Sequence, residues 1–289
     1  MSATCRSRIR TVHRTLLCSA AVLGLTHAAT ASPILVTPIA TESFEYTSPT
    51  LAGQNGGTGW SGGWKSDAGL TTDSSVAMQS SSLDAPDGYF GTPSGGSAVA
   101  PDGEIMVMYR GFADPIDMDT DQDYYMSFLV RRTGTPKSAS FALQSGSTTV
   151  AQFGFSTGGT MNILAPGDNA FGDSAQVGVG PVNLLVVKIA AKSGAGEDQL
   201  FMSNFRGPFD LLDSQTVPFA PPDTWEVEGS AAVVNDSITQ FAVLRGDEGT
   251  FELDEIRIGT EWQNIAGIPE PASLGLLGAG LLLVTRRRR

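Results

Sequence analysis

The chain has 289 residues, with 30 acidic and 18 basic side chains and a formal net charge of −12. Its only cysteines, Cys5 and Cys18, and its only histidines, His13 and His27, lie within the first 27 residues. Beyond residue 27, the composition therefore excludes disulfides, thiol nucleophiles, Ser-His-Asp triads and zinc sites built from histidine or cysteine.

The N-terminal segment has the three parts of a secretory signal peptide. The arginine-rich stretch Arg6 to Arg14 is followed by the apolar stretch Leu16 to Leu25, and Ala29-Thr30-Ala31 is a small-residue cleavage site. Cleavage after Ala31, with Ala29 as the other small residue, would remove residues 1–31. We therefore expect an exported protein that begins near Ser32, with residues 32–41 as a linker.

Without the signal segment, residues 1–31, and the C-terminal tail, residues 266–289, the chain is strongly acidic. It keeps 10 basic and 29 acidic residues, a net charge of −19. Such a surface repels nucleic acid and anionic lipid and suits a soluble external protein. Nucleic-acid partners are thus excluded. Because no cysteine remains, an ordinary hydrophobic core must stabilise the domain predicted over residues 42–265.

The interior of the sequence predicts an all-β domain. Short segments rich in Val, Ile, Phe and Tyr alternate with Gly, Ser, Asp and Pro clusters, and no long stretch has helical periodicity. The predicted strands are Ile105 to Tyr109, Tyr124 to Arg131, Ser140 to Leu143, Val150 to Phe155, Met161 to Leu164, Asn183 to Ala190, Gln199 to Asn204, Ser237 to Arg245 and Thr250 to Gly259. Regularly spaced short strands are typical of a two-sheet β-sandwich or jelly roll.

The clearest local signal is a hairpin predicted over Ser237 to Gly259. Its two alternating segments are joined by the turn-forming sequence Gly246-Asp247-Glu248-Gly249. The alternation of apolar and polar residues is interrupted between Leu253 and Ile256, where a β-bulge would return Ile256 and Ile258 to the core face.

Four local strings, taken in order, resemble one type of domain. They are Ser43 to Tyr46, Gly53 to Trp64, Tyr124 to Arg131 and Leu253 to Thr260. The strings are similar to those of exported LamG-like, concanavalin A-like jelly rolls. The resemblance implies a jelly roll over residues 42–265.

Trp60 and Trp64 are candidate glycan-binding residues. They lie in a glycine-rich loop with Gln54 and Asn55, and aromatic faces beside amides can stack on sugar rings. The competing interpretation, which we favour, is that both rings anchor the loop to the core.

Alternate aspartates before the strand at Tyr124 form a candidate Ca²⁺ site. Asp117, Asp119 and Asp121 could converge oxygen ligands on the ion, with Asp114 and Asp123 nearby. Gln122 stands where an EF-hand loop needs its glycine, so this is not an EF-hand. A solvated acidic loop is the favoured interpretation, and no cofactor is predicted.

Glu252 and Asp254 are the candidate catalytic carboxylates. The concanavalin A-like fold includes glycoside hydrolases with a Glu-x-Asp-x-(x)-Glu pattern, and Glu252-Leu253-Asp254 matches its first half. Ile256 and Arg257 occupy the two positions where the second glutamate could fall. We therefore predict a non-enzymatic protein, with a carboxylate-dependent glycoside hydrolase or lyase as the alternative.

The C-terminal tail reads as a membrane segment with a basic end. Pro271 suits the first turn of a helix, and the following apolar run reaches Thr285, a rise of only about 22 Å against a hydrocarbon core of about 30 Å. The four arginines Arg286, Arg287, Arg288 and Arg289 favour the cytoplasmic side. We expect a short membrane helix over 271–285 that leaves the preceding chain outside.

Pro269, Glu270 and Pro271, followed by the apolar helix and the basic end, resemble the PEP-CTERM sorting signal over residues 266–289. The resemblance implies secretion, membrane anchoring through the helix, and processing by an exosortase near the Pro-Glu-Pro sequence. It also implies delivery to the cell surface or the exopolysaccharide matrix.

Together these observations predict an exported structural or polysaccharide-binding protein. The expected partners are the secretion machinery, an exosortase and extracellular polysaccharide. Because some ice-binding proteins carry a tail of this kind, ice binding is a further alternative. The chain has no rows of Thr-x-Thr repeats of useful length, so this alternative ranks below polysaccharide binding.

Overall fold

The computed structural model describes residues 37–66, 76–86, 89, 92–100, 106–133, 138–165, 168–194, 198–206, 220–231, 237–245 and 250–266. The predicted signal peptide and the predicted membrane helix over 271–285 lie outside these residues. Within the described ranges, no helix combines the length and the apolar character needed to cross a bilayer.

The described chain is built almost entirely from strands. These are β1 (Ala40–Glu42), β2 (Lys65–Ser66), β3 (Ala77–Gln79), β4 (Ser97–Ala100), β5 (Met106–Asp117), β6 (Asp123–Thr133), β7 (Ala139–Ser145), β8 (Thr148–Phe155), β9 (Thr160–Ala165), β10 (Asp168–Gln176), β11 (Val182–Ala190), β12 (Asp198–Arg206), β13 (Val227–Ala231), β14 (Ser237–Arg245) and β15 (Thr250–Gly259). A 3₁₀ turn (Thr157–Gly159) and a short helix α1 (Trp262–Ala266) complete the elements.

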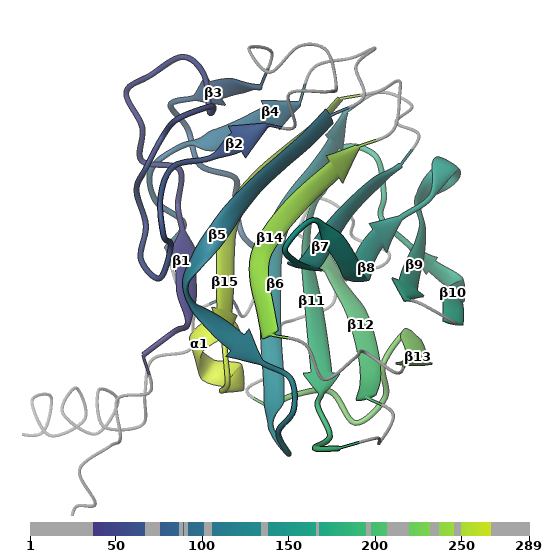
Figure 1. The fold of residues 1–289 in the computed structure, drawn as a ribbon. Helices are drawn as coiled ribbons and strands as arrows, with labels where there is room; N and C mark the ends of the chain where they lie inside the picture. The colour runs from purple at the N-terminus through teal and green to yellow at the C-terminus, as the bar shows by residue number, and fades with distance from the viewer. Residues whose placement is uncertain are drawn as a thin grey trace, which may run out of the picture. The chain divides into compact units, whose positions relative to one another are not determined.

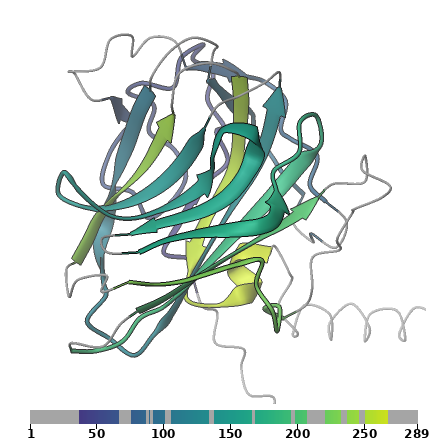
Figure 2. The ribbon, with the colours of Figure 1, turned by 90° about the vertical axis from the view of Figure 1, so that its right-hand side faces the viewer.

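The strands form two antiparallel sheets that pack face to face (Figures 1 and 2). The eight-stranded sheet has the order β13-β12-β11-β6-β15-β4-β3, with β1 paired to β15. The seven-stranded sheet has the order β10-β9-β8-β7-β14-β5-β2. The predicted all-β, two-sheet architecture is therefore confirmed. Every predicted strand is present, whereas β1 to β4, β10 and β13 were not anticipated.

The predicted hairpin over Ser237 to Gly259 is wrong. β14 lies in the seven-stranded sheet between β7 and β5, and β15 lies in the eight-stranded sheet between β6 and β4. The chain crosses between the layers because each strand buries its own apolar side chains in the shared interior from opposite sides. Phe241 of β14 and Leu253 of β15 belong to the same core.

The predicted bulge in β15 is confirmed. The pairing with β6 shifts register between Asp254 and Arg257, and Glu255 adopts a left-handed backbone conformation with φ of 48°. The extra residue restores Ile256 and Ile258 to the interior, where both are fully buried.

Stacked phenylalanines bridge the two sheets at the centre of the core. The ring of Phe128 on β6 lies 4.3 Å from that of Phe141 on β7 and 5.5 Å from that of Phe241 on β14, measured between centroids. A nearby interior space lined in part by Met108 and Val243 has a volume of about 10 Å³, room for no more than about one water. The core around these residues is therefore closely packed.

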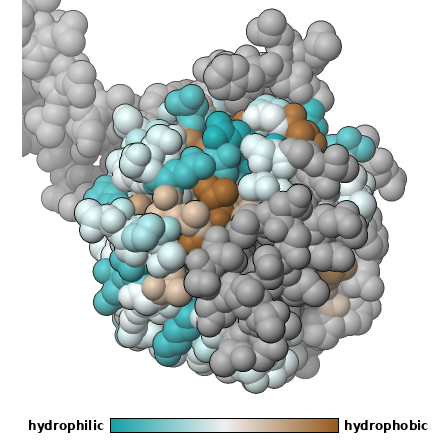
Figure 3. Space-filling model, turned by 90° about the horizontal axis from the view of Figure 1, so that it is seen from above, coloured by the Kyte–Doolittle hydropathy of each residue, from teal (hydrophilic) through white to brown (hydrophobic). Residues whose placement is uncertain are grey.

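The outer face of the eight-stranded sheet carries a second apolar cluster. Tyr125 and Leu129 of β6 pack there with Trp262 and Ile265 of α1 and with Leu83. Both faces of β6 and β11 are consequently buried, which explains why their sequences are almost continuously apolar instead of alternating. Figure 3 views the sandwich from the end that is uppermost in Figure 1, where hydrophobic residues show between hydrophilic ones.

Candidate functional site

The two glycan-binding candidates from the glycine-rich loop face inward. The side chain of Trp64 is 1% exposed, and its Nε1 donates a hydrogen bond to Oε2 of Glu42 over 3.2 Å. The half-buried ring of Trp60 stacks on Phe112 at 5.3 Å and donates to the carbonyl of Thr41 over 2.8 Å. Trp64 therefore has no ring face to offer a sugar, whereas the ring of Trp60 is partly exposed.

Both rings enclose a buried ion pair. Arg110 of β5 is fully buried and donates to Glu42, itself 1% exposed, from its Nη1 atom. The guanidinium carbon lies 5.1 Å from the ring centroid of Trp60 and 5.9 Å from that of Trp64. Its other nitrogens donate to Asn55 Oδ1 (2.7 Å) and to the carbonyls of Gly56 (2.8 Å) and Gly62 (2.6 Å). This cluster holds the loop of residues 53–64 against the sandwich.

The candidate catalytic carboxylates are also engaged. Glu252 accepts two hydrogen bonds from Arg131, at 3.1 Å from Nε and 2.5 Å from Nη2. Asp254 is fully buried and accepts from the Ser82 hydroxyl, from Leu83 N at 2.9 Å and from Glu255 N at 2.7 Å. Burial raises the pKa of Asp254 to about 7, although the hydrogen bonds that its carboxylate accepts lower the pKa. The two side chains thus tie β15 to its neighbours.

The aspartates proposed for Ca²⁺ accept hydrogen bonds from separate partners. Asp117 accepts from Asp119 N at 3.0 Å, and Asp119 accepts from Gly194 N at 2.6 Å. Asp121 accepts from the backbone and hydroxyl of Ser193 at 3.3 and 3.2 Å. Within the described part of the chain, no three acidic side chains are grouped so that they could share a metal ion.

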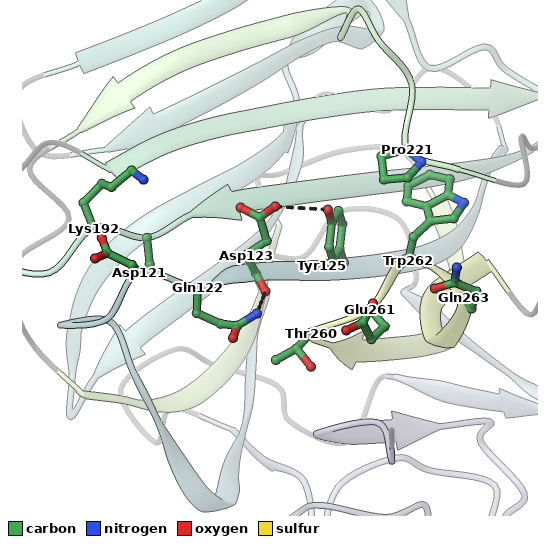
Figure 4. Close-up of a pocket in the computed structure, with 11 residues that line it drawn as sticks. Asp121, Gln122, Asp123, Tyr125, Lys192, Pro221, Thr260, Glu261, Trp262 and Gln263 are labelled. Atoms are coloured by element: carbon green, nitrogen blue, oxygen red, sulfur yellow. Dashed lines mark hydrogen bonds between the residues drawn. The ribbon is translucent and has the colours of Figure 1, made fainter. Parts of the chain in front are cut away.

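Asp121 and Asp123 instead line a pocket beyond the ends of β6, β11 and β15 (Figure 4). Its volume is about 510 Å³. The lining residues are Asp121, Gln122, Asp123, Tyr125, Ala191, Lys192, Pro221, Thr260, Glu261, Trp262 and Gln263. They come from the β5–β6 turn, the end of β11, the segment before β13, and the β15–α1 junction. The pocket is therefore assembled from four stretches of sequence.

Strand pairing explains why these stretches meet. Tyr125 is opposite Lys188 of β11 on one side and Gly259 of β15 on the other. The start of β6 therefore lies beside the ends of β11 and β15, and α1 follows β15 directly. Trp262 is 2% exposed and packs edge-to-face against Tyr125 at 6.0 Å between ring centroids. This contact packs α1 against the sheet.

The pocket has a negative electrostatic character. The Tyr125 hydroxyl donates to Asp123 Oδ2 over 3.3 Å, and Lys188 Nζ lies 2.8 Å from the same oxygen. The pKa of Tyr125 is raised to about 12, mainly by burial. The charge of Asp123, the hydrogen bond to it and the charge of Glu261 raise the pKa further, in that order. Tyr125 therefore stays protonated at physiological pH and remains a hydrogen-bond donor.

A half-buried tryptophan extends the aromatic wall of the pocket. Trp225 packs edge-to-face on Trp262 at 6.5 Å and lies 5.7 Å from Phe201 of β12, measured between ring centroids. Sequence reasoning missed both residues. Trp225 has no aromatic or amide neighbour in the sequence, whereas Trp262 is followed by the amides Gln263 and Asn264, a signal that could have identified it.

Comparison with known proteins identifies the tail. Residues 267–289 match the family model of the PEP-CTERM protein-sorting motif, which indicates an exported protein sorted to the cell envelope. No curated protein matches the sequence.

Three solved structures illustrate the distant structural likeness of the chain. The T. cruzi calreticulin globular domain is 12% identical with a TM-score of 0.46, and the match covers 88% of this chain and 100% of that one. Lectin II from Ulex europaeus is 10% identical, with a TM-score of 0.38 and coverages of 65% and 93%. Domain 4 of AbnA, a GH43 extracellular arabinanase from Geobacillus stearothermophilus solved with arabinotriose, is 12% identical, with a TM-score of 0.43 and coverages of 81% and 99%. All three TM-scores lie below 0.5.

Proposed function

We propose that this is a non-enzymatic, polysaccharide-binding protein of the cell surface or extracellular matrix, with a jelly roll of the concanavalin A-like kind. Its tail serves as an exosortase substrate, and the helix over 271–285 anchors the protein in the membrane until it is processed. The pocket between Asp121 and Gln263 binds the polysaccharide.

The observation that carries this proposal is the chemistry of the pocket wall. The amides of Gln122 and Gln263, the hydroxyl of Thr260 and the carboxylates supply donors and acceptors that match the hydroxyls of a sugar. Pro221 supplies apolar surface beside them, and the buried rings of Tyr125 and Trp262 support the wall from behind (Figure 4). A concave site with convergent polar groups next to aromatic rings is typical of small-ligand recognition.

The polar residues that line the pocket lead to a direct prediction about glycan binding. Replacing Thr260 and Gln263 together with alanine should weaken binding to the best ligand of a glycan panel about tenfold, because two hydrogen bonds of about 0.5–1.5 kcal/mol each are lost. Calorimetry on the purified full-length chain measures the effect.

The matched control is Gln79→Ala. Gln79 is an exposed amide on β3, at the end of the sandwich opposite α1 in Figure 1, and its loss should leave binding unchanged. Equal binding by the pocket variant and the native chain would assign the ligand to another surface. Failure of the native chain to bind any glycan would overturn the proposed function.

A carboxylate-dependent glycoside hydrolase or lyase is the second candidate. It is favoured by Asp254, because a carboxyl with a pKa of about 7 suits general acid catalysis. Against it, Asp254 is fully buried, both of its oxygens accept hydrogen bonds, and Glu252 is paired with Arg131. Neither carboxylate is free to meet a glycosidic bond.

Product analysis separates the two functions. We expect a bound polysaccharide to keep its chain length and its reducing ends after prolonged incubation with the full-length protein. The enzymatic function would be established by new products that disappear in both Glu252→Gln and Asp254→Asn.

A further inference from the structure

We propose that the pocket selects a polysaccharide bearing protonated amines, a hexosamine polymer with free amino groups, over one bearing uronates. This inference rests on the proposed function and names the chemical class of its ligand.

Formal charges around the pocket are predominantly negative. Asp121, Asp123 and Glu261 line it, and Lys192 is the basic residue among the described lining residues. The nearest other lysine, Lys188, is paired with Asp123 at 2.8 Å and lies over the ring of Tyr125 at 5.9 Å. Its charge is therefore directed at a carboxylate of the pocket and is largely neutralised there.

Glu261 is the carboxylate most available to a ligand. Its side chain is exposed, and no hydrogen bond or ion pair of that side chain occurs among the described residues. It nevertheless lies close enough to Tyr125 for its charge to raise the pKa of the phenol. An ammonium group in the pocket would therefore meet a free carboxylate on the wall that also holds the aromatic rings.

Asp123 supplies the second acceptor. Its side chain is 40% exposed, although Lys188 and Tyr125 contact one of its oxygens. An ammonium group has three donors and forms short, charge-assisted bonds of about 2.7–2.9 Å to carboxylates. A uronate in the same place would have its carboxylate beside those of Glu261 and Asp123, and Lys192 is the single cation among the described lining residues to set against these and Asp121.

The charge of the whole domain acts in the same direction. The net charge of −19 remaining after both terminal segments are removed attracts a polycation and repels a polyuronate during diffusional approach. This long-range attraction is shared by the entire surface, so an experiment must separate it from recognition in the pocket.

The test compares three oligosaccharides on the purified full-length chain at mildly acidic pH, where the amines carry their protons. The first is an oligoglucosamine, the second is the same oligomer after complete N-acetylation, and the third is an oligouronate of equal length. We expect the free-amine oligomer to bind about tenfold more tightly than its acetylated form, and the uronate to bind most weakly. Added salt should reduce the difference.

Two variants that each remove one negative charge locate the effect. Glu261→Gln should weaken binding of the free-amine oligomer about three- to tenfold and leave the acetylated oligomer almost unchanged. Asp114→Asn is the matched control, because Asp114 is an exposed carboxylate on β5, in the other sheet. It should change neither affinity.

Each contrary outcome has a distinct meaning. Equal or tighter binding of the acetylated or uronate oligomer would overturn the amine selectivity and leave the polysaccharide-binding function standing. Equal losses in the two variants would assign the attraction to the surface as a whole and overturn the role of the pocket. If none of the oligomers binds and the wider glycan panel is also negative, the proposed function fails with this inference.

Discussion

Replacing Arg110 with methionine should lower the free energy of unfolding by about 3–5 kcal/mol, because it leaves Glu42 as a buried carboxylate without its cation. Glu42 is 1% exposed, and its remaining partners are the Phe44 amide, the Tyr46 hydroxyl and the Trp64 indole. The loop held by the guanidinium would also lose its bonds to Asn55 and Gly56. Denaturant unfolding followed by tryptophan fluorescence measures the loss.

A double variant separates the charge effect from the packing effect. Arg110→Met combined with Glu42→Gln should lose less stability than the sum of the two single variants, since no uncompensated charge stays buried. The interpretation would be contradicted by strictly additive losses, or by a single Arg110→Met variant as stable as the native protein. The cluster would then be ordinary packing.

The stability of the native protein should fall between about pH 4 and pH 7 in a way that depends on Asp254. Its pKa is raised from 3.8 to about 7 in the folded protein, mainly by burial. Below this interval the carboxyl is protonated in both the folded and unfolded states. Within it, the unfolded chain releases the proton while the folded protein keeps it, so folding loses up to about 1.4 kcal/mol per pH unit.

The variant Asp254→Asn isolates this effect, because its side chain is neutral at every pH. The free energy of unfolding of the variant minus that of the native protein should become more positive by a few kcal/mol from about pH 4 to pH 7 and then stay level. The exposed control Asp114→Asn should give a nearly constant difference. A constant or falling difference for Asp254→Asn would show that the carboxyl titrates near its ordinary value.

The two carboxylates that match the first half of the glycoside hydrolase pattern illustrate how accessibility depends on packing. Glu252 and Asp254 stand two residues apart on one strand, which puts both on the same face of the sheet. That face is covered by other segments, and each carboxylate has become a structural acceptor for Arg131 or for Ser82 and Leu83. Spacing along a strand predicts the face on which side chains lie, and packing decides whether they stay accessible.

Local patterns in the sequence were sufficient for nine of the fifteen strands and for the C-terminal sorting motif. The apolar alternation from Ser237 to Gly259 predicted both β14 and β15, and its slip near Leu253 predicted the bulge at Glu255. These features depend on side chains a few residues apart. The pairing of β14 with β5 and β7 depends instead on distant segments, so the short turn between the two strands suggested a hairpin that does not form.

The sequence by itself determined that this is an acidic, all-β protein with a C-terminal sorting motif and no cysteine or histidine beyond residue 27. Composition, hydropathy and short-range periodicity are properties of neighbouring residues, and no folding is needed to read them. Only the tertiary structure decided that Trp64 is enclosed with Arg110 and that Trp262, Tyr125 and Glu261 form a pocket wall. Trp64 is far from Arg110 in the chain, and Tyr125 is far from Glu261 and Trp262. They meet because strands from distant parts of the sequence pair and bury their apolar faces together.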